Sequence, residues 1–142
     1  MKTIKQLLDE KGSDIWSIGP QETVFRAIKD MAEKEIGALV VLDNGKLVGI
    51  ISERDYARKV ILKDKASHDT TVEEIMTSPV VCGHLDQTVD ECMALITDKR
   101  VRHLPIIDQD RIIGVISIGD LVKSIIAEQQ FVIEQLEHYI SG

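Results

Sequence analysis

The chain has 142 residues, of which 17 Lys and Arg and 24 Asp and Glu give a formal net charge of −7, and 44% of its residues are hydrophobic. The acidic balance argues against general nucleic-acid binding, because a phosphate backbone is bound by clustered Lys and Arg; a small anion in a local basic pocket is compatible with it. The sequence contains no run of ~18 apolar residues, the length needed to span a membrane. We also expect no secretory signal at the N-terminus. Cys82 and Cys92 lack the spacing of metal ligands, so we expect no metal site and a cytoplasmic protein.

The first half of the chain predicts an N-terminal helical segment and then five further elements. A short strand is expected at residues 15–18. An amphipathic helix follows Thr23, with Val24, Ala27, Ile28 and Met31 spaced as one helical face. Asn44-Gly45 is a strong hairpin signal, which joins two predicted strands. These strands and the helix after them are expected at residues 38–42, 47–52 and 53–62.

The second half predicts the same series after a polar loop at residues 63–70. Residues 71–74, Thr-Val-Glu-Glu, form a capping box that opens a short helix. Then come a strand at 79–82, a helix with the stripe Val89, Cys92, Met93 and Ile96, strands at 104–107 and 112–117, and a helix at 118–127. A terminal helix is expected at residues 128–140, either docked on its own domain or forming a dimer contact.

The two halves are copies of one unit. A shift of 65 residues lays residues 21–60 over 86–125 without a gap, and nine of these 40 positions are identical. A unit of about 60 residues buries little surface alone, so the copies are expected to pack on each other. The prediction is an α+β fold of two β-α-β-β-α repeats at residues 1–64 and 71–127, with a C-terminal helix at 128–142.

The repeated element is Gly-apolar-apolar-Ser-x-x-Asp, at residues 49–55 and 114–120, where a strand leads into a helix. One interpretation is structural, because Ser-x-x-Asp is a capping box. The other is functional. A helix N-terminus and a Ser hydroxyl suit a phosphate, and a carboxylate one turn later suits ribose hydroxyls. Both interpretations apply to the same residues.

The duplicated motif, the tandem unit and the segment Arg102-His103-Leu104-Pro105 resemble a pair of cystathionine-β-synthase (CBS) domains, in the form of the short stand-alone bacterial proteins. The resemblance implies repeats related by a pseudo-two-fold axis, with two clefts that bind adenosine compounds. AMP is the first expectation for the ligand, with ATP, ADP, NAD(H) and S-adenosylmethionine as alternatives. It also implies a flat homodimer of two pairs.

The resemblance assigns residues to each cleft. Cleft A would bind ribose through Asp120 and phosphate through Ser117 and the N–H groups of Ile118 and Gly119, with Arg102 and His103 neutralising charge. Its adenine would contact Trp16, Ile36, Gly37 and Ala38. Cleft B would use Ser52, Arg54 and Asp55, with Val81, Leu104 and Pro105 beside the base.

No catalytic role is predicted. The sequence offers no Ser/His/Asp triad, no Gly-x-x-x-x-Gly-Lys phosphate loop and no metal-ligand cluster. We therefore expect a nucleotide sensor that acts on an unknown effector protein, with no nucleic-acid or membrane partner. The alternative is a protein-interaction or dimerisation module whose clefts are vestigial.

Overall fold

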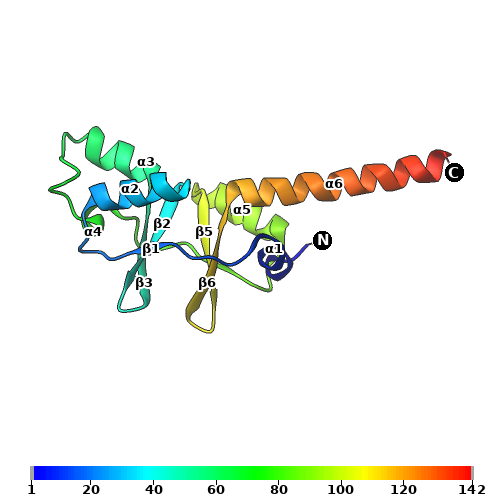
Figure 1. Cartoon of the computed structure of the whole chain (residues 1–142). Helices are drawn as coiled ribbons and strands as arrows, with labels where there is room; N and C mark the ends of the chain where they lie inside the picture. The colour runs from blue at the N-terminus through cyan, green and yellow to red at the C-terminus, as the bar shows by residue number, and fades with distance from the viewer. Residues whose placement is uncertain (1, 142) are drawn as a thin grey trace. The chain divides into compact units, whose positions relative to one another are not determined.

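The computed structural model describes residues 2–141 (Figure 1), which form two compact units. The repeat-1 unit comprises Ile15–Val80, and the repeat-2 unit comprises Val81 to the C-terminus together with the N-terminal residues up to Asp14. Each unit holds a three-stranded sheet with helices packed on it, so the predicted α+β class and the two repeats are confirmed.

In the repeat-1 unit the central strand β2 pairs in parallel with β1 and antiparallel with β3. Helix α2 begins after Thr23, whose side chain accepts a hydrogen bond from the Arg26 N–H. The second helix of the repeat opens as α3 and continues as a short π-helix, η1. The bounds are β1 Ser17–Ile18, α2 Val24–Lys34, β2 Ala38–Asp43, β3 Lys46–Ser52, α3 Glu53–Tyr56, η1 Ala57–Ile61 and α4 Val72–Ile75.

The repeat-2 unit has the same sheet order, with β5 between β4 and β6. Its core joins buried side chains of α1, α5, both long strands and the start of α6. The bounds are α1 Ile4–Lys11, β4 Gly83–His84, α5 Val89–Lys99, β5 His103–Asp108, β6 Arg111–Ser117 and α6 Ile118–Ser141. The expected long strands and amphipathic helices are thus present in both halves.

The strand expected at residues 79–82 is wrong, because β4 begins only at Gly83. In the repeat-1 unit the Val40 N–H donates to the Trp16 carbonyl at 3.2 Å and so extends the pairing of the first strand. Pro105 occupies the place of Val40 in the second repeat, and proline has no N–H to donate. The second repeat therefore lacks the hydrogen bond that would carry its first strand further back.

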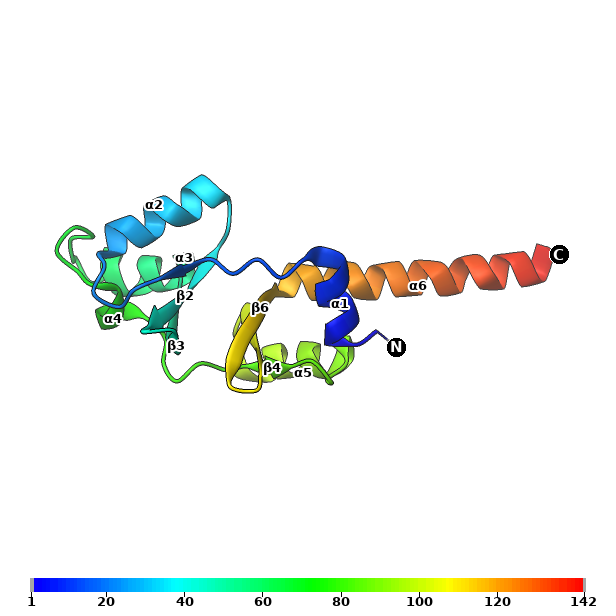
Figure 2. The same ribbon diagram turned by 60° about the horizontal axis from the view of Figure 1, so that its bottom comes forward.

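Residues 128–140 are helical, as predicted, but they continue the helix expected at 118–127 and do not form a separate one. Helix α6 runs without a break through Ser141, and Figure 2 shows it as one continuous ribbon. No glycine or proline lies between Asp120 and Ser141, so nothing in the chain ends the helix earlier. Although α6 has 24 residues, no helix in the described part of the chain is long and apolar enough to cross a membrane.

The two short helices α1 and α4 occupy equivalent places in opposite units. Each opens with a capping box, at Thr3 and at Thr71. Thr3 forms a bridge with Thr88, the N-cap of α5, and Thr71 forms the matching bridge with Thr23, the N-cap of α2. Helix α1 precedes the first repeat in sequence but packs in the repeat-2 unit, whereas α4 packs in the repeat-1 unit. The expected range 1–64 for the first repeat does not reflect this exchange.

At equivalent positions in the two sheets, a glycine contacts a side chain from the short helix or its C-cap. A Cβ placed on Gly114 would lie 2.8 Å from Leu8 Cδ2, and one placed on Gly49 would meet the Met76 side chain. The missing side chain lets the helix residue lie directly on the strand. The glycine of the repeated motif therefore serves packing, in the same way in both units.

Candidate functional site

The Ser-x-x-Asp motif of the first repeat forms a complete capping box. The Asp55 N–H donates to Ser52 Oγ at 3.2 Å, and the Ser52 N–H donates to Asp55 Oδ2 at 3.0 Å. The Ser52 hydroxyl also donates to Oδ2, at 3.1 Å. The structural interpretation of the motif is therefore satisfied here, and Asp55 is set at the first turn of α3.

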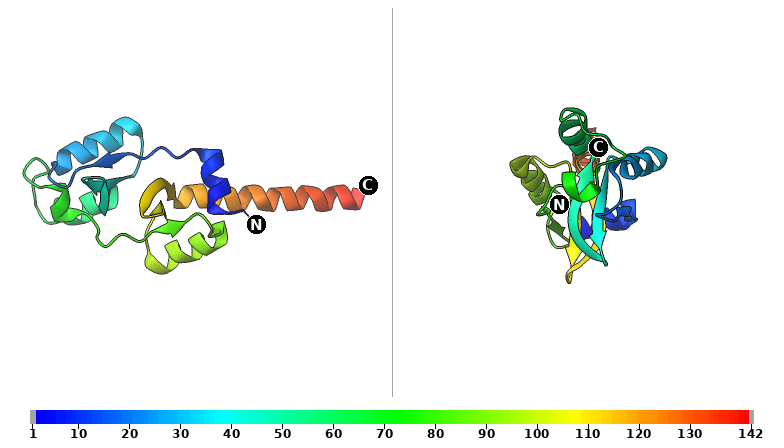
Figure 3. Two further views of the ribbon diagram at one scale, coloured as in Figure 1. Left: turned by 90° about the horizontal axis from the view of Figure 1, so that it is seen from below. Right: turned by 90° about the vertical axis from the view of Figure 1, so that its left-hand side faces the viewer.

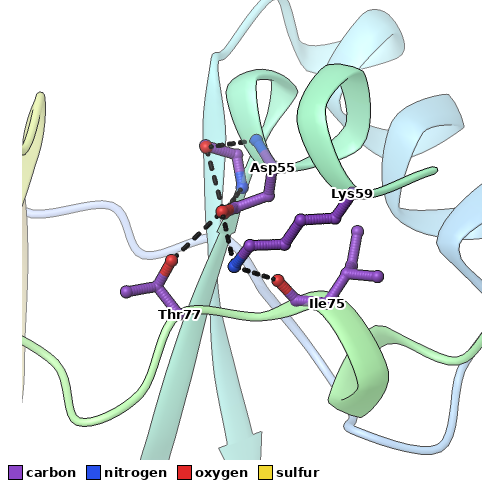
Figure 4. Close-up of polar contacts among 5 residues, drawn as sticks. Asp55, Lys59, Ile75 and Thr77 are labelled. Carbon is purple, nitrogen blue, oxygen red and sulfur yellow. Dashed lines mark hydrogen bonds and ion pairs between the residues drawn. The ribbon is translucent and has the colours of Figure 1, made fainter. Parts of the chain in front are cut away.

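The second carboxylate oxygen of Asp55 is engaged as well (Figure 4). Its Oδ1 accepts from the Thr77 hydroxyl at 3.1 Å and lies 3.2 Å from Lys59 Nζ. Lys59 also donates to the Ile75 carbonyl at 2.9 Å, which ties η1 to the end of α4. Since both oxygens have partners, a ribose would have to displace or share these contacts.

In Asp120, the equivalent carboxylate of the second repeat, only one oxygen accepts hydrogen bonds from the described residues. Its Oδ2 accepts from the Ser117 N–H at 2.9 Å and from Lys11 Nζ at 2.7 Å. Lys11 comes from α1 and also donates to the Val115 carbonyl at 2.8 Å. Among residues 2–141, nothing donates to Asp120 Oδ1, which leaves this oxygen available to a ligand hydroxyl.

The lysines that pair with the two aspartates come from different places. Lys59 is four residues after Asp55 on the same helical segment, and the equivalent position after Asp120 is Ser124. Ser124 is buried, and its hydroxyl has no partner among the described residues. Helix α1 thus supplies the ammonium group for Asp120, because α6 has no lysine at the position equivalent to Lys59.

The charge of Asp120 is stabilised by this arrangement. Partial burial disfavours the carboxylate, but the hydrogen bond and charge of Lys11 and the hydrogen bonds of Ser117 outweigh it, so the pKa of Asp120 lies below its ordinary value near 3.8. A group with a lowered folded-state pKa adds stability above its unfolded pKa and loses it as the pH falls through the folded one.

This contribution of Asp120 to the free energy of unfolding should depend on pH, and a comparison of wild type with Asp120→Asn should show it. We expect the wild type to have the higher free energy of unfolding at neutral pH, and the difference to shrink as the pH falls below about 4. Urea unfolding followed by circular dichroism at several pH values measures it. A difference that stays constant down to pH ~2 would contradict the ionic role of Asp120.

The first backbone N–H of α6, and that of α3, already donates a hydrogen bond. This corrects the expectation that the Ile118 N–H binds phosphate in cleft A. The Ile118 N–H donates to the Arg102 carbonyl at 2.9 Å, and the Glu53 N–H donates to the Gly37 carbonyl at 3.1 Å. The Ile118 amide is thus already used in linking α6 to the start of β5. Of the two expected amide donors to phosphate, Gly119 is the one that remains in the proposal.

The polar residues expected near the phosphates lie at the same end of each sheet. His103 is half-buried and pairs with Ser117 across β5 and β6, and Arg102 precedes it with an exposed side chain. Arg54 is half-buried in the first turn of α3. In the repeat-2 unit the structure therefore places Arg102 and His103 at the start of β5, next to Ser117 at the end of β6.

The residues expected to contact adenine fall into two groups. Trp16 is 42% exposed, with Lys34 Nζ 4.0 Å from its ring centroid, so it is not a core residue. Ile36, Gly37 and Ala38 are half-buried, and Ala38 pairs with Ser52. In contrast, Leu104 is 0% exposed in the core and Pro105 is buried. Val81 is only partly buried and packs against that core. The side chain of Leu104 therefore presents no surface to a ligand within its own unit.

Sequence reasoning missed three residues of the site: Lys11, Lys59 and Thr77. A usable signal existed for Lys11, because residues 3–8 repeat the pattern of residues 71–76, a Thr, then Gln or Glu three residues later, and apolar residues on one face. This pattern shows that α1 and α4 are equivalent elements. Lys59 lies one helical turn after Asp55, a spacing typical of an ion pair.

Metal or thiol chemistry finds no support in the described residues. No group of three or more His, Cys, Asp or Glu among them is placed to hold a metal ion. Cys92 is buried in the core, which raises the pKa of its thiol to about 11. Burial also raises the pKa of Cys82. Neither thiol has the lowered pKa of a reactive cysteine.

The family follows from comparison with known proteins. A model of the CBS domain matches residues 8–62 and 72–127, so the chain belongs to the CBS-domain family and carries two copies of the domain. A protein with CBS domains from Burkholderia ambifaria MC40-6 is 52% identical, with a TM-score of 0.87 over 90% of this chain and 96% of that one. The mitochondrial CBS domain-containing protein CBSX3 of Arabidopsis thaliana is 37% identical over 99% of this chain and 72% of its own length.

A second similar structure contains ligands. The CBS domain pair of protein MJ0100, in complex with 5′-methylthioadenosine and S-adenosyl-L-methionine, is 26% identical. It has a TM-score of 0.80 over 90% of this chain and 98% of that one. CBS pairs are regulatory modules, and structural relatives of this chain bind adenosine-containing ligands.

Proposed function

We propose that the protein is a non-catalytic sensor of adenine nucleotides, with AMP as its main ligand and ATP, ADP, NAD(H) or S-adenosylmethionine as alternatives. The observation that carries the proposal is the Asp120 carboxylate, which is ionised and has one oxygen available in the described part of the chain. This carboxylate stands at the first turn of α6, is kept charged by Lys11, and leaves Oδ1 available among residues 2–141. An ionised acceptor at this position suits the two hydroxyls of a ribose.

The proposed cleft A combines this group with residues of both repeats. Ser117, the Gly119 N–H, Arg102 and His103 would bind phosphate, and Trp16, Ile36, Gly37 and Ala38 would bind adenine. The exposed indole of Trp16 supports this assignment, because an aromatic face stacks well on a base. Ligand binding would favour one conformation of the module, which an effector protein then recognises, and we expect the chain to act as a homodimer.

The proposed cleft B, with Ser52, Arg54, Asp55, Val81 and Pro105, is the weaker site. Both oxygens of Asp55 already have partners, so nucleotide binding there would break the contacts to Thr77 or Lys59. Leu104 would contribute only as core support, because its side chain is buried. We therefore expect cleft A to fill first.

Isothermal titration calorimetry with AMP, ATP, ADP, NADH and S-adenosylmethionine tests the sensor. We expect at least one compound to bind with a dissociation constant well below about 1 mM, at one site per chain before a second. Adenosine without phosphate and GMP are the controls for the phosphate and base contacts. If every compound binds no more tightly than millimolar, the sensor proposal fails.

A second candidate function is a protein-interaction module with vestigial clefts. The complete capping geometry of both Ser-x-x-Asp motifs favours it, because capping alone gives both residues a role. Under this alternative no adenosine compound binds, yet the chain still forms its complexes. The same titrations therefore separate the two functions.

A further inference from the structure

Helix α6 continues well past the body of the repeat-2 unit. Its buried residues, Leu121 and Ser124, lie near its start, and every residue from Ile126 to Ser141 is exposed. Figure 3 shows this C-terminal part extending beyond α1 and α5 of the same unit. Beside α5, Val132 and Ile133 line a groove together with Asp90. The sixteen residues from Ile126 to Ser141 are therefore all exposed within their own unit.

The exposed part of α6 is not uniformly polar. Ile126 is 60% exposed, Leu136 is 56% and Tyr139 is 84%. Apolar side chains recur every seven residues in two rows along one face, at Ile125, Val132 and Tyr139 and at Ile126, Ile133 and Ile140. A third row holds Val122 and Leu136, two heptads apart, with Gln129 between them. We call this set the α6 stripe. Ala127, Glu134 and Ser141 lie on the opposite face, and Phe131, which is 61% exposed, also lies outside the stripe.

A repeat of seven residues has a specific structural meaning. It keeps an apolar seam facing a second helix of the same period, in the knobs-into-holes packing of coiled coils. A helix that only covered its own globular unit would follow the 3.6-residue period and would be buried along its length. The α6 stripe thus indicates pairing with another helix of the same repeat.

We propose that a second copy of this chain covers the α6 stripe, with the two α6 helices packed antiparallel. Three observations support a copy of the same chain. The stripe is self-complementary, as an interface across a two-fold axis must be. Helix α6 itself supplies the required heptad period. The large side chains of the stripe are exposed, Leu136 by 56% and Tyr139 by 84%, so a second helix packed on them would remove apolar surface from water. The proposal rests on the homodimer of the proposed function, but not on nucleotide binding.

The side chains that border the stripe favour the antiparallel orientation. With Ile125 opposite Leu136 of the second copy, Ile126 lies beside Ile133 of that copy along one border. Along the other border Glu128 lies beside Gln135, so a carboxylate meets an amide donor. A parallel pair would instead place Glu128 beside Ile133. The antiparallel register therefore pairs apolar with apolar and polar with polar.

Sedimentation equilibrium of the full chain and two variants tests the interface. We expect wild type to be dimeric at micromolar concentration, and Leu136→Glu to weaken the dimer at least roughly tenfold, because it places a carboxylate in the seam. Ala127→Glu adds the same charge on the opposite face and should leave the mass unchanged. Circular dichroism verifies that both variants remain helical.

Two outcomes of the sedimentation experiment would contradict the proposal, and they have different meanings. If Leu136→Glu is as dimeric as wild type, the α6 stripe is not the interface, although the homodimer stands. If wild type is monomeric at ~100 μM, both the interface and the homodimer fail. Nucleotide titrations on Leu136→Glu report on the sensor separately, because this residue lies outside the proposed clefts.

The orientation is measured with a spin label at Ser141→Cys in a Cys82→Ser background, since buried Cys92, with a pKa of about 11, resists labelling. In the antiparallel register the two labels are separated by about 21 residues of helix, or roughly 30 Å at 1.5 Å per residue. Double electron–electron resonance should show this distance. A distance near 10 Å would overturn the antiparallel arrangement.

Discussion

Replacing Asp120 with Asn should weaken AMP binding by roughly 10- to 150-fold, because a hydrogen bond to a charged acceptor contributes about 1.5–3 kcal/mol. Asn keeps the size of the side chain, and its amide oxygen can still accept from the Ser117 N–H, so the helix keeps its cap. What it loses is the negative charge that attracts ribose hydroxyls. Calorimetric titration of wild type and variant with AMP measures the effect.

The matched control for this variant is Asp55→Asn, the same change at the equivalent position. We expect it to affect the first binding event far less, because both oxygens of Asp55 are already engaged by Ser52, Thr77 and Lys59. Equal losses from the two variants would show that the repeats bind nucleotide equivalently. If Asp120→Asn binds as wild type does but unfolds at lower urea, the role of the carboxylate is capping alone.

The second large effect concerns stability and the N-terminal helix. Ile4→Ala should lower the free energy of unfolding by about 2–5 kcal/mol, as is usual when a fully buried Ile is truncated. Ile4 is 0% exposed and belongs to the core of the repeat-2 unit, with Leu7 and Leu8. Urea unfolding followed by circular dichroism measures the change.

Lys5→Ala serves as the control, since the neighbouring side chain is exposed on the same helix. It should change the free energy of unfolding by less than about 0.5 kcal/mol. A similarly small effect of Ile4→Ala would mean that α1 does not pack on the repeat-2 unit in solution. The position of Lys11 beside Asp120 would then be in doubt as well.

Much of the local structure could be predicted from the sequence. Periodicity located both amphipathic helices, and continuous apolar runs located the long strands to within one residue at each end. The capping box at Thr71 and the hairpin at Asn44-Gly45 depend on neighbouring residues only. Such features are determined by short-range geometry, which is why a single sequence is enough to find them.

Two of the three errors lie where separate segments meet. The expected strand at 79–82 ignored Pro105, which lies on the neighbouring strand and withholds a hydrogen bond. The expected separate terminal helix rested on an assumed end of the second repeat, although no residue there breaks a helix. Cleft A was also expected to use the Ile118 amide, which the Arg102 carbonyl already occupies.

By itself, the sequence determined that the chain contains two copies of one unit and that each copy places a Ser and an Asp where a strand leads into a helix. Only the tertiary structure decided how the two aspartates differ. Lys59 reaches Asp55 from the same helical segment, whereas Lys11 reaches Asp120 from 109 residues away. That contact depends on which sheet α1 packs against, and this is governed by the burial of Ile4, Leu7 and Leu8 rather than by any local pattern.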